Sequence, residues 1–193
     1  MRVSTLVALG LSLSALAGAS VASGSTRTHG APASGGAAYD QQTSPGTGTS
    51  TPSRPTVPGT VGRIRGGVAY APDAAPMPVK RAIWAANVIR QRPYVYGGGH
   101  GSFRSNGYDC SGTVSYALHG GGLLRSPLDS SSFESWGQSG RGAWITVYTN
   151  PGHAWAVIAG MRLDTSGPGQ RGPRWRTQSR SSSGFVSRHP VGY

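Results

Sequence analysis

Cysteine, acidic residues and lysine are scarce in this sequence. Cys110 is the only cysteine among 193 residues, which excludes an internal disulfide framework and a cysteine-based zinc cluster. Six acidic residues stand against 18 basic ones, all of which are Arg except Lys80, and the formal net charge is +12. Such an excess favours an anionic partner. The length suits one domain of common size and argues against a two-domain enzyme.

The amino-terminal residues predict export. An apolar run from Val3 to Ala19 is short and rich in small residues, and cleavage sites for a signal peptidase follow Ala19 or Ala22. We expect a secretory signal peptide over residues 1–22, and therefore a protein that is secreted and lies outside the cell or on its wall, without a stable membrane span. An uncleaved anchor is the alternative. No cysteine near the cleavage site is available to carry a lipid.

Glycine and proline, 31 and 14 residues, are abundant and exclude a fully helical bundle. They gather with Ser and Thr in residues 23–77, where few large apolar residues offset the entropy cost of ordering the chain. We predict that residues 23–77 form a disordered linker. The folded domain is expected over residues 78–193, including an Arg- and Gly-rich carboxy-terminal extension.

Helical and strand periodicities follow one another along this domain. Apolar residues recur at helical spacing between Pro78 and Pro93 and again from Cys110 to Leu118, and a capping box at residues 131–134 predicts a short third helix. Period-two patterns then predict strands over residues 144–148, 153–159 and 161–165, with edge strands at 174–176 and 185–187. Helices followed by an antiparallel meander indicate an α+β fold.

Cys110 is placed by these elements at the first turn of the second helix. Peptide dipoles and unpaired N–H groups at a helix start favour the thiolate, which is the nucleophilic form of cysteine. The simpler interpretation is a small apolar residue that caps a core helix. The polar and small neighbours Asp109, Ser111 and Gly112 favour a cleft wall over a packed interior.

A nucleophilic thiol needs a base, and His153 opens a strand directly after the turn at residues 150–152. The other four histidines lie in the linker, in glycine-rich loops or near the carboxy terminus. A base in turn needs a partner that orients its second ring nitrogen. Asp164, on the next strand, can lie beside His153; its alternative role is a surface ion pair with Arg162 or Arg174.

Three blocks of this sequence resemble the NlpC-type cysteine peptidases of bacterial cell walls. They are Tyr-Val-Tyr-Gly-Gly at 94–98, Tyr-Asp-Cys-Ser-Gly at 108–112 and Gly-His at 152–153. The likeness covers roughly residues 78–165. It implies a papain-like core and hydrolysis of peptide bonds in peptidoglycan stem peptides, typically between D-glutamate and the diamino acid.

The resemblance also implies roles for individual residues. Cys110 would be the nucleophile, His153 the general base and Asp164 the third catalytic residue, where the family more often has His, Asn or Gln. Tyr94 would stand beside the nucleophile and assist an oxyanion, and Asp109 and Ser111 would hold the amino end of the substrate. Residues 140–144 lack the Pro-Gly-Asp turn usual in the family, and residues 100–106 and the tail after Ser166 have no obvious family counterpart.

Two alternatives remain open at this point. The same thiol–histidine core could serve an amidase or acyltransferase, or the chain could be a non-catalytic cationic protein that binds the cell wall. The expected partners are peptidoglycan or its stem peptides, with anionic wall polymers as further candidates. The export signal argues against nucleic acid, and no DNA- or RNA-binding motif is present. We expect a monomer without metal or cofactor.

Overall fold

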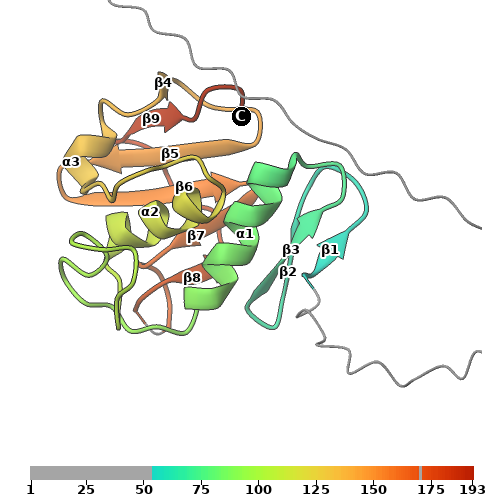
Figure 1. Cartoon of the computed structure of the whole chain (residues 1–193), viewed down its shortest axis with the longest axis horizontal. Coiled ribbons are helices and arrows are strands. Elements are labelled where there is room, and N and C mark those ends of the chain that lie inside the picture. Colours follow the sequence, from blue (N-terminus) through green and yellow to red (C-terminus); the bar gives the residue numbers. More distant parts are fainter. Residues whose placement is uncertain (1–53, 170) are drawn as a thin grey trace, which may run out of the picture. The chain divides into compact units, whose positions relative to one another are not determined.

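The computed structural model describes residues 54–169 and 171–193 (Figure 1). Three helices and two sheets make an α+β fold, as the sequence predicted. Helix α1 is Met77–Ile89, α2 is Cys110–Gly120 and α3 is Ser130–Phe133. The strands are β1 (Thr56–Val57), β2 (Arg63–Arg65), β3 (Val68–Pro72), β4 (Gln138–Ser139), β5 (Ile145–Asn150), β6 (His153–Ile158), β7 (Met161–Asp164), β8 (Arg174–Arg176) and β9 (Val186–His189).

The larger sheet has six strands in the order β4-β9-β5-β6-β7-β8, and every neighbouring pair is antiparallel. Strands β5 to β7 form the predicted meander, and β8 pairs with β7 beside it. One face of this sheet carries Val147, Ala156 and Leu163, which are fully buried in the core together with apolar residues of α1 and α2. A helix that begins at a cysteine and packs on an antiparallel sheet is the expected papain-like arrangement.

The tight connection between β5 and β6 fixes where His153 lies. Asn150 pairs with His153 across the two strands, and only Pro151 and Gly152 separate them. The Asn150 Oδ1 atom accepts hydrogen bonds from the backbone N–H groups of Gly152 and His153, at 3.0 and 2.9 Å. Asparagine often closes turns in this way. His153 is therefore held at the first position of a strand.

The linker expectation is wrong for residues 54–77, which contain β1, β2, β3 and the first residue of α1. Ala69 and Ala71 are fully buried, and the buried Asn87 side chain of α1 accepts from Ala69 N–H and donates to Ala69 C=O at 2.9 and 2.8 Å. These small residues bury little surface by themselves and are ordered by packing on α1. The amino-acid composition of this amino-terminal segment could not show that it packs on α1. The remainder of the expected linker and the expected signal peptide lie outside the described residues.

The carboxy-terminal residues are part of the sheet. β8 lies at an edge, as predicted, whereas β9 lies between β4 and β5 instead of at an edge. The chain between them crosses the sheet, and Arg180 and Phe185 pack against Trp155 of β6 on the way. The short α3 is capped by Asp129, whose carboxylate accepts from Ser132 N–H at 2.7 Å, so the capping box expected to begin at Ser131 is wrong.

Candidate active site

A glycine-rich loop at residues 97–99 meets the first turn of α2 and sets the position of Cys110. Asp109 is the N-cap of this helix, and its Oδ1 atom accepts from Gly112 N–H at 2.8 Å. Its Oδ2 atom accepts from Gly97 N–H at 3.0 Å, and Asp109 N–H donates to the Gly98 carbonyl at 3.1 Å. A Cβ atom at Gly112 would collide with that carbonyl. The first two sequence blocks therefore interlock through backbone contacts that only glycine permits.

Cys110 is the first residue of α2 and is 8% exposed. It lies close enough to the His153 ring to raise the pKa of that imidazole. Nε2 of the ring lies 3.0 Å from Asp164 Oδ1, so Nδ1 is the ring nitrogen that remains for a thiol. A thiol in contact with an imidazole can pass its proton to the ring, and the helix start favours the thiolate that results.

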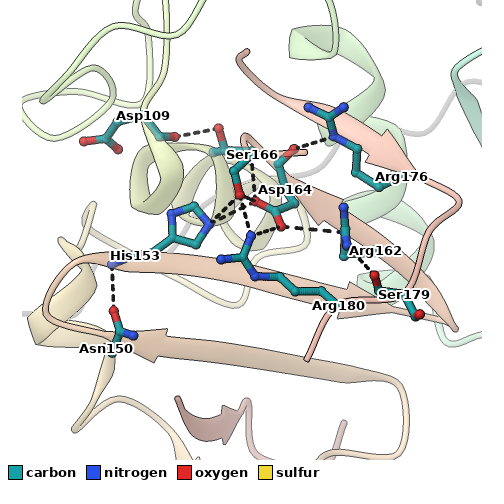
Figure 2. Close-up of polar contacts among 10 residues, drawn as sticks. Asp109, Asn150, His153, Arg162, Asp164, Ser166, Arg176, Ser179 and Arg180 are labelled. Atoms are coloured by element: carbon teal, nitrogen blue, oxygen red, sulfur yellow. Dashed lines mark hydrogen bonds and ion pairs between the residues drawn. The ribbon is translucent and has the colours of Figure 1, made fainter. Parts of the chain in front are cut away.

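Asp164 is fully buried and surrounded by donors (Figure 2). Besides His153, its carboxylate accepts from the backbone N–H and the hydroxyl of Ser166 at 2.9 and 3.0 Å, and from Arg180 Nη1 at 3.1 Å. Arg162 Nε lies 3.6 Å away. Burial alone would raise the pKa of Asp164, but these hydrogen bonds and positive charges lower it, so the carboxylate is ionised.

The His153 ring is held in its protonated form by the same contacts. Burial acts to lower the pKa of His153, but hydrogen bonds and charge interactions with Asp164 and Cys110 outweigh it and raise the pKa to about 9. The ring also meets Phe185 edge-on, with centroids 6.3 Å apart. An imidazolium that lies between a carboxylate and a cysteine is the arrangement in which a thiol–histidine ion pair can form.

Tyr94 lies close enough to Cys110 and Asp109 to feel both of their charges. Burial and these two negative charges raise the pKa of the Tyr94 hydroxyl. The phenol therefore stays protonated and can donate a hydrogen bond near the thiol. The structure thus brings together Tyr94, Cys110, His153 and Asp164, the predicted site residues that the sequence scattered over 71 positions from 94 to 164.

Asp109 and Ser111 have a neighbour that the sequence did not point to. His100 Nε2 lies 2.9 Å from Asp109 Oδ2 and 2.9 Å from Ser111 Oγ. Ser111 Oγ also donates to Asp109 Oδ1 at 3.2 Å. The Asp109 carboxylate is thus already bound by two backbone N–H groups, a hydroxyl and an imidazole. Because its carboxylate is already bound by these groups, Asp109 is suited to joining the loop that contains Gly97 and His100 to the start of α2.

Sequence reasoning missed His100, Ser166 and Arg180 as parts of the site. His100 lies in a glycine-rich loop and Arg180 in a stretch of Ser and Arg, so neither had a periodic pattern around it. Ser166 had a usable signal, because an aspartate side chain commonly accepts from the backbone N–H group two residues further on, as Asp164 does here. Its hydroxyl lies 3.4 Å from His153 Nε2.

Neither a metal centre nor a membrane-spanning helix was found in the part of the chain that the structure describes. Within residues 54–169 and 171–193, no three His, Cys, Asp or Glu side chains are grouped so that they could hold a metal ion. Among the same residues, no helix has the length and apolar character needed to cross a bilayer.

Comparisons with known proteins gave similarity to solved structures. No family model and no curated protein matches the sequence. The chain resembles Rv1477, a hypothetical invasion protein of Mycobacterium tuberculosis, with a TM-score of 0.44, 23% identity and coverage of 60% of this chain and 66% of that one. A mutated form of the resuscitation promoting factor interacting protein RipA gives a TM-score of 0.44, 22% identity and the same coverages.

RipD of Mycobacterium tuberculosis is described as a non-catalytic NlpC/p60 domain protein adapted to peptidoglycan binding. Its TM-score is 0.36 at 19% identity, and the match covers 54% of this chain and all of RipD. The matches to Rv1477 and RipA span just under two thirds of those chains. At these identities the similarity concerns the fold, and the function of this chain rests on its own residues.

Proposed function

We propose that this chain is a secreted cysteine peptidase that hydrolyses peptide bonds in the stem peptides of peptidoglycan. The observation that carries the proposal is a His153 ring whose Nε2 lies 3.0 Å from the buried Asp164 carboxylate and whose pKa is raised by Asp164 and by Cys110, the first residue of α2. The choice of substrate rests on the sequence blocks around Tyr94, Cys110 and His153. Their glycines fit the backbone contacts that place the thiol.

In the proposed reaction the His153 ring already holds the proton given up by the Cys110 thiol, and the sulfur attacks the carbonyl carbon of the scissile amide. The oxyanion that forms is stabilised by N–H groups at the start of α2 and by the Tyr94 hydroxyl. The imidazolium then gives its proton to the amide nitrogen, and the C–N bond breaks, leaving a thioester on Cys110. Water, deprotonated by His153, hydrolyses the thioester, which releases the acid and restores the thiol.

Asp164 does not exchange protons in this scheme. Its carboxylate accepts from Nε2–H, which fixes the ring orientation and leaves Nδ1 toward the sulfur. Ser166 and Arg180 hold the carboxylate in turn. Asp164 is thus proposed as the orienting residue of the triad.

Digestion of purified peptidoglycan by the full chain, followed by mass analysis of the fragments, tests the proposal. We expect new amino and carboxyl ends within stem peptides, and no such ends with Cys110→Ala. Cleavage at the bond between sugar and stem would instead favour the amidase alternative. Intact peptidoglycan after incubation with unmodified chain would favour the non-catalytic binding protein. Alkylation by iodoacetamide near pH 6 checks the thiolate independently.

A further inference from the structure

The chain between β8 and β9 lies across one face of the larger sheet, where β5, β6 and β7 separate these two strands. Ala156 and Leu163 face the core beside α1 and α2. Their neighbours Trp155 and Arg162 lie on the opposite face, because successive residues of a strand alternate. They are nevertheless only 3% and 9% exposed. Residues 179–185, which we call the strap, help to cover them.

Two side chains of the sheet hold the backbone of the strap. Arg162 Nη1 donates to the Ser179 carbonyl at 3.1 Å, and Asn150 Nδ2 donates to the Gly184 carbonyl at 3.0 Å. The same asparagine closes the turn between β5 and β6. Residues 181–184 are exposed. The strap is therefore fixed at its two ends and by the long side chains that it carries.

The Arg180 guanidinium of the strap lies against two aromatic rings, 5.9 Å from the centroid of Trp155 and 5.4 Å from that of Phe185. The two rings meet edge-on, and Tyr148 stacks on Trp155 at 4.3 Å. A guanidinium that lies on rings keeps its in-plane N–H groups for a carboxylate. Arg180 Nη1 donates to Asp164 Oδ2 at 3.1 Å (Figure 2).

Arg162 and Arg180 both lie near the Asp164 carboxylate but differ in what they give it. Arg162 Nε is 3.6 Å from Oδ2 and has no hydrogen-bond partner among the described residues. It supplies positive charge without a directed bond. Arg176 Nε donates to the backbone carbonyl of Asp164 at 3.4 Å. Arg180, by contrast, donates to the carboxylate itself and so restricts its rotation.

The two oxygens of this carboxylate have different donors. Oδ1 accepts from His153 Nε2 at 3.0 Å and from the N–H group and the hydroxyl of Ser166, whereas Oδ2 accepts from Arg180. Rotation of the carboxylate would break hydrogen bonds at both oxygens, and such bonds weaken steeply when their geometry is lost. Without Arg180, the carboxylate of Asp164 would lose its hydrogen bond at Oδ2 and turn more easily away from the ring.

An aspartate at this position also needs a positive partner. Asp164 is fully buried, and an ionised carboxylate is costly to bury unless it is paired and hydrogen-bonded. The Asn or Gln often found at this place in the NlpC-type pattern carries no negative charge. Arg180 belongs to the tail after Ser166, which has no obvious counterpart in that pattern. The unusual aspartate and the additional arginine therefore complement each other.

We propose that Arg180 is a positioning residue of the proposed active site, which fixes the rotation of the Asp164 carboxylate and thereby the orientation of the His153 ring. Trp155 and Phe185 hold its guanidinium, and Phe185 also meets the His153 ring edge-on. The proposal rests on the proposed function for the reaction that the ring serves. It makes the carboxy-terminal strap a part of the site.

NMR titration of the His153 ring in the full chain tests this inference, with the signal assigned by its absence from His153→Ala. Arg180→Met removes the charge and the hydrogen-bond donor, whereas Arg180→Gln keeps an N–H donor without the charge. Phe185→Leu keeps Arg180 and removes one of the two rings that hold it. Arg125→Met, at an exposed position, is the matched control with the same charge change as Arg180→Met. The kcat/KM on a stem-peptide substrate is measured for each variant.

The sign of the shift separates positioning from a direct effect of charge. The pKa of His153 is about 9 in the unmodified chain. Removal of a nearby positive charge would by itself raise this pKa, whereas loss of the oriented carboxylate lowers it. We expect Arg180→Met to lower it to about 8 and to reduce kcat/KM on the order of tenfold. Arg180→Gln should recover most of both losses, Phe185→Leu should lower the pKa less and kcat/KM about threefold, and Arg125→Met should change neither.

An unchanged or raised pKa of His153 in folded Arg180→Met would overturn the proposal. Losses in Arg180→Gln as large as those in Arg180→Met would overturn it as well, because charge alone would then explain them. If Arg180→Met does not fold, Phe185→Leu decides, since a wild-type pKa and a wild-type kcat/KM in that variant would exclude the positioning role. The titration needs no turnover, so it tests Arg180 even in a chain that cleaves no stem peptide, whereas digestion of peptidoglycan tests the proposed function.

Discussion

Two histidine–aspartate pairs flank Cys110, and they differ in burial and in what else binds each carboxylate. In the His153–Asp164 pair the side chains are 18% and 0% exposed, and two guanidinium groups accompany the carboxylate. In the His100–Asp109 pair they are 34% and 5% exposed, and the carboxylate instead accepts from the N–H groups of Gly97 and Gly112. The two pairs thus have the same residue types but differ in burial and in the groups that bind the carboxylate.

That difference suits the first pair to the proposed chemistry and the second pair to a structural role. The first pair lies on two neighbouring strands and directs a charged ring at the thiol, while arginines keep the carboxylate ionised. The second pair joins a loop to the helix start and satisfies its unpaired donors. A His–Asp contact near a cysteine therefore does not identify a catalytic base. The groups around the ring distinguish the two pairs, and for His153 they include Cys110, which raises the pKa of the ring.

The largest effect should come from breaking the first pair at its histidine. His153→Ala removes both the proton acceptor and the counterion of the thiolate, so we expect kcat/KM on a stem-peptide substrate to fall by on the order of 10² to 10⁴. Alkylation by iodoacetamide near pH 6 should slow as well. A variant that keeps wild-type kcat/KM and wild-type alkylation would show that His153 is not the base.

Replacing Asp164 should cost less rate and more stability. Asp164→Ala removes the orienting acceptor but leaves the thiol–imidazole contact, so we expect a loss at the lower end of the range, on the order of 10². It also leaves the buried Arg162 without its counterion, which costs about 3–5 kcal/mol. Asp164→Asn keeps an acceptor oxygen and should retain more turnover. Thermal melts beside the kinetics separate the two effects, and wild-type rates in Asp164→Ala would exclude it as the orienting residue.

The pH profile should sharpen the comparison further. The pKa of His153 is raised from 6.5 to about 9, so the ion pair between His153 and Asp164 persists to about pH 9 and is lost above it. Stability from this group is complete below pH 6.5 and declines as pH rises toward 9. The alkaline limb of kcat/KM is expected near pH 9 in the wild type and about one unit lower in Asp164→Asn. A limb that stays near pH 9 in Asp164→Asn would show that Asp164 does not set the charge of the ring.

Helices, the meander and the positions of the candidate site residues were predictable because each has a local signal. Periodicity marked α1 and α2, and β6 began at the histidine that the turn at 150–152 indicated. Ala69 and Ala71 carried no such signal, because their burial depends on Asn87 and α1, which come later in the chain. Arg180 reaches Asp164 only after the chain crosses the sheet. Long-range contacts of this kind cannot be inferred from amino-acid composition or from residue spacing.

The smallest effect should come from the second pair, at His100. Its Nε2 atom bonds Asp109 and Ser111 but is not among the groups that shift the pKa of His153. We expect His100→Ala to lower kcat/KM by no more than about threefold and to cost about 1 kcal/mol of stability, since the lost contacts are partly exposed hydrogen bonds. For a domain of this size that corresponds to a melting temperature about 2–4 °C lower. His100→Gln, which can still donate to Asp109, should recover most of that loss. His100→Ala could instead lose as much kcat/KM as His153→Ala while melting at the wild-type temperature. In that case the His100–Asp109 pair would take part in catalysis, and burial and carboxylate partners would not distinguish a catalytic pair from a structural one.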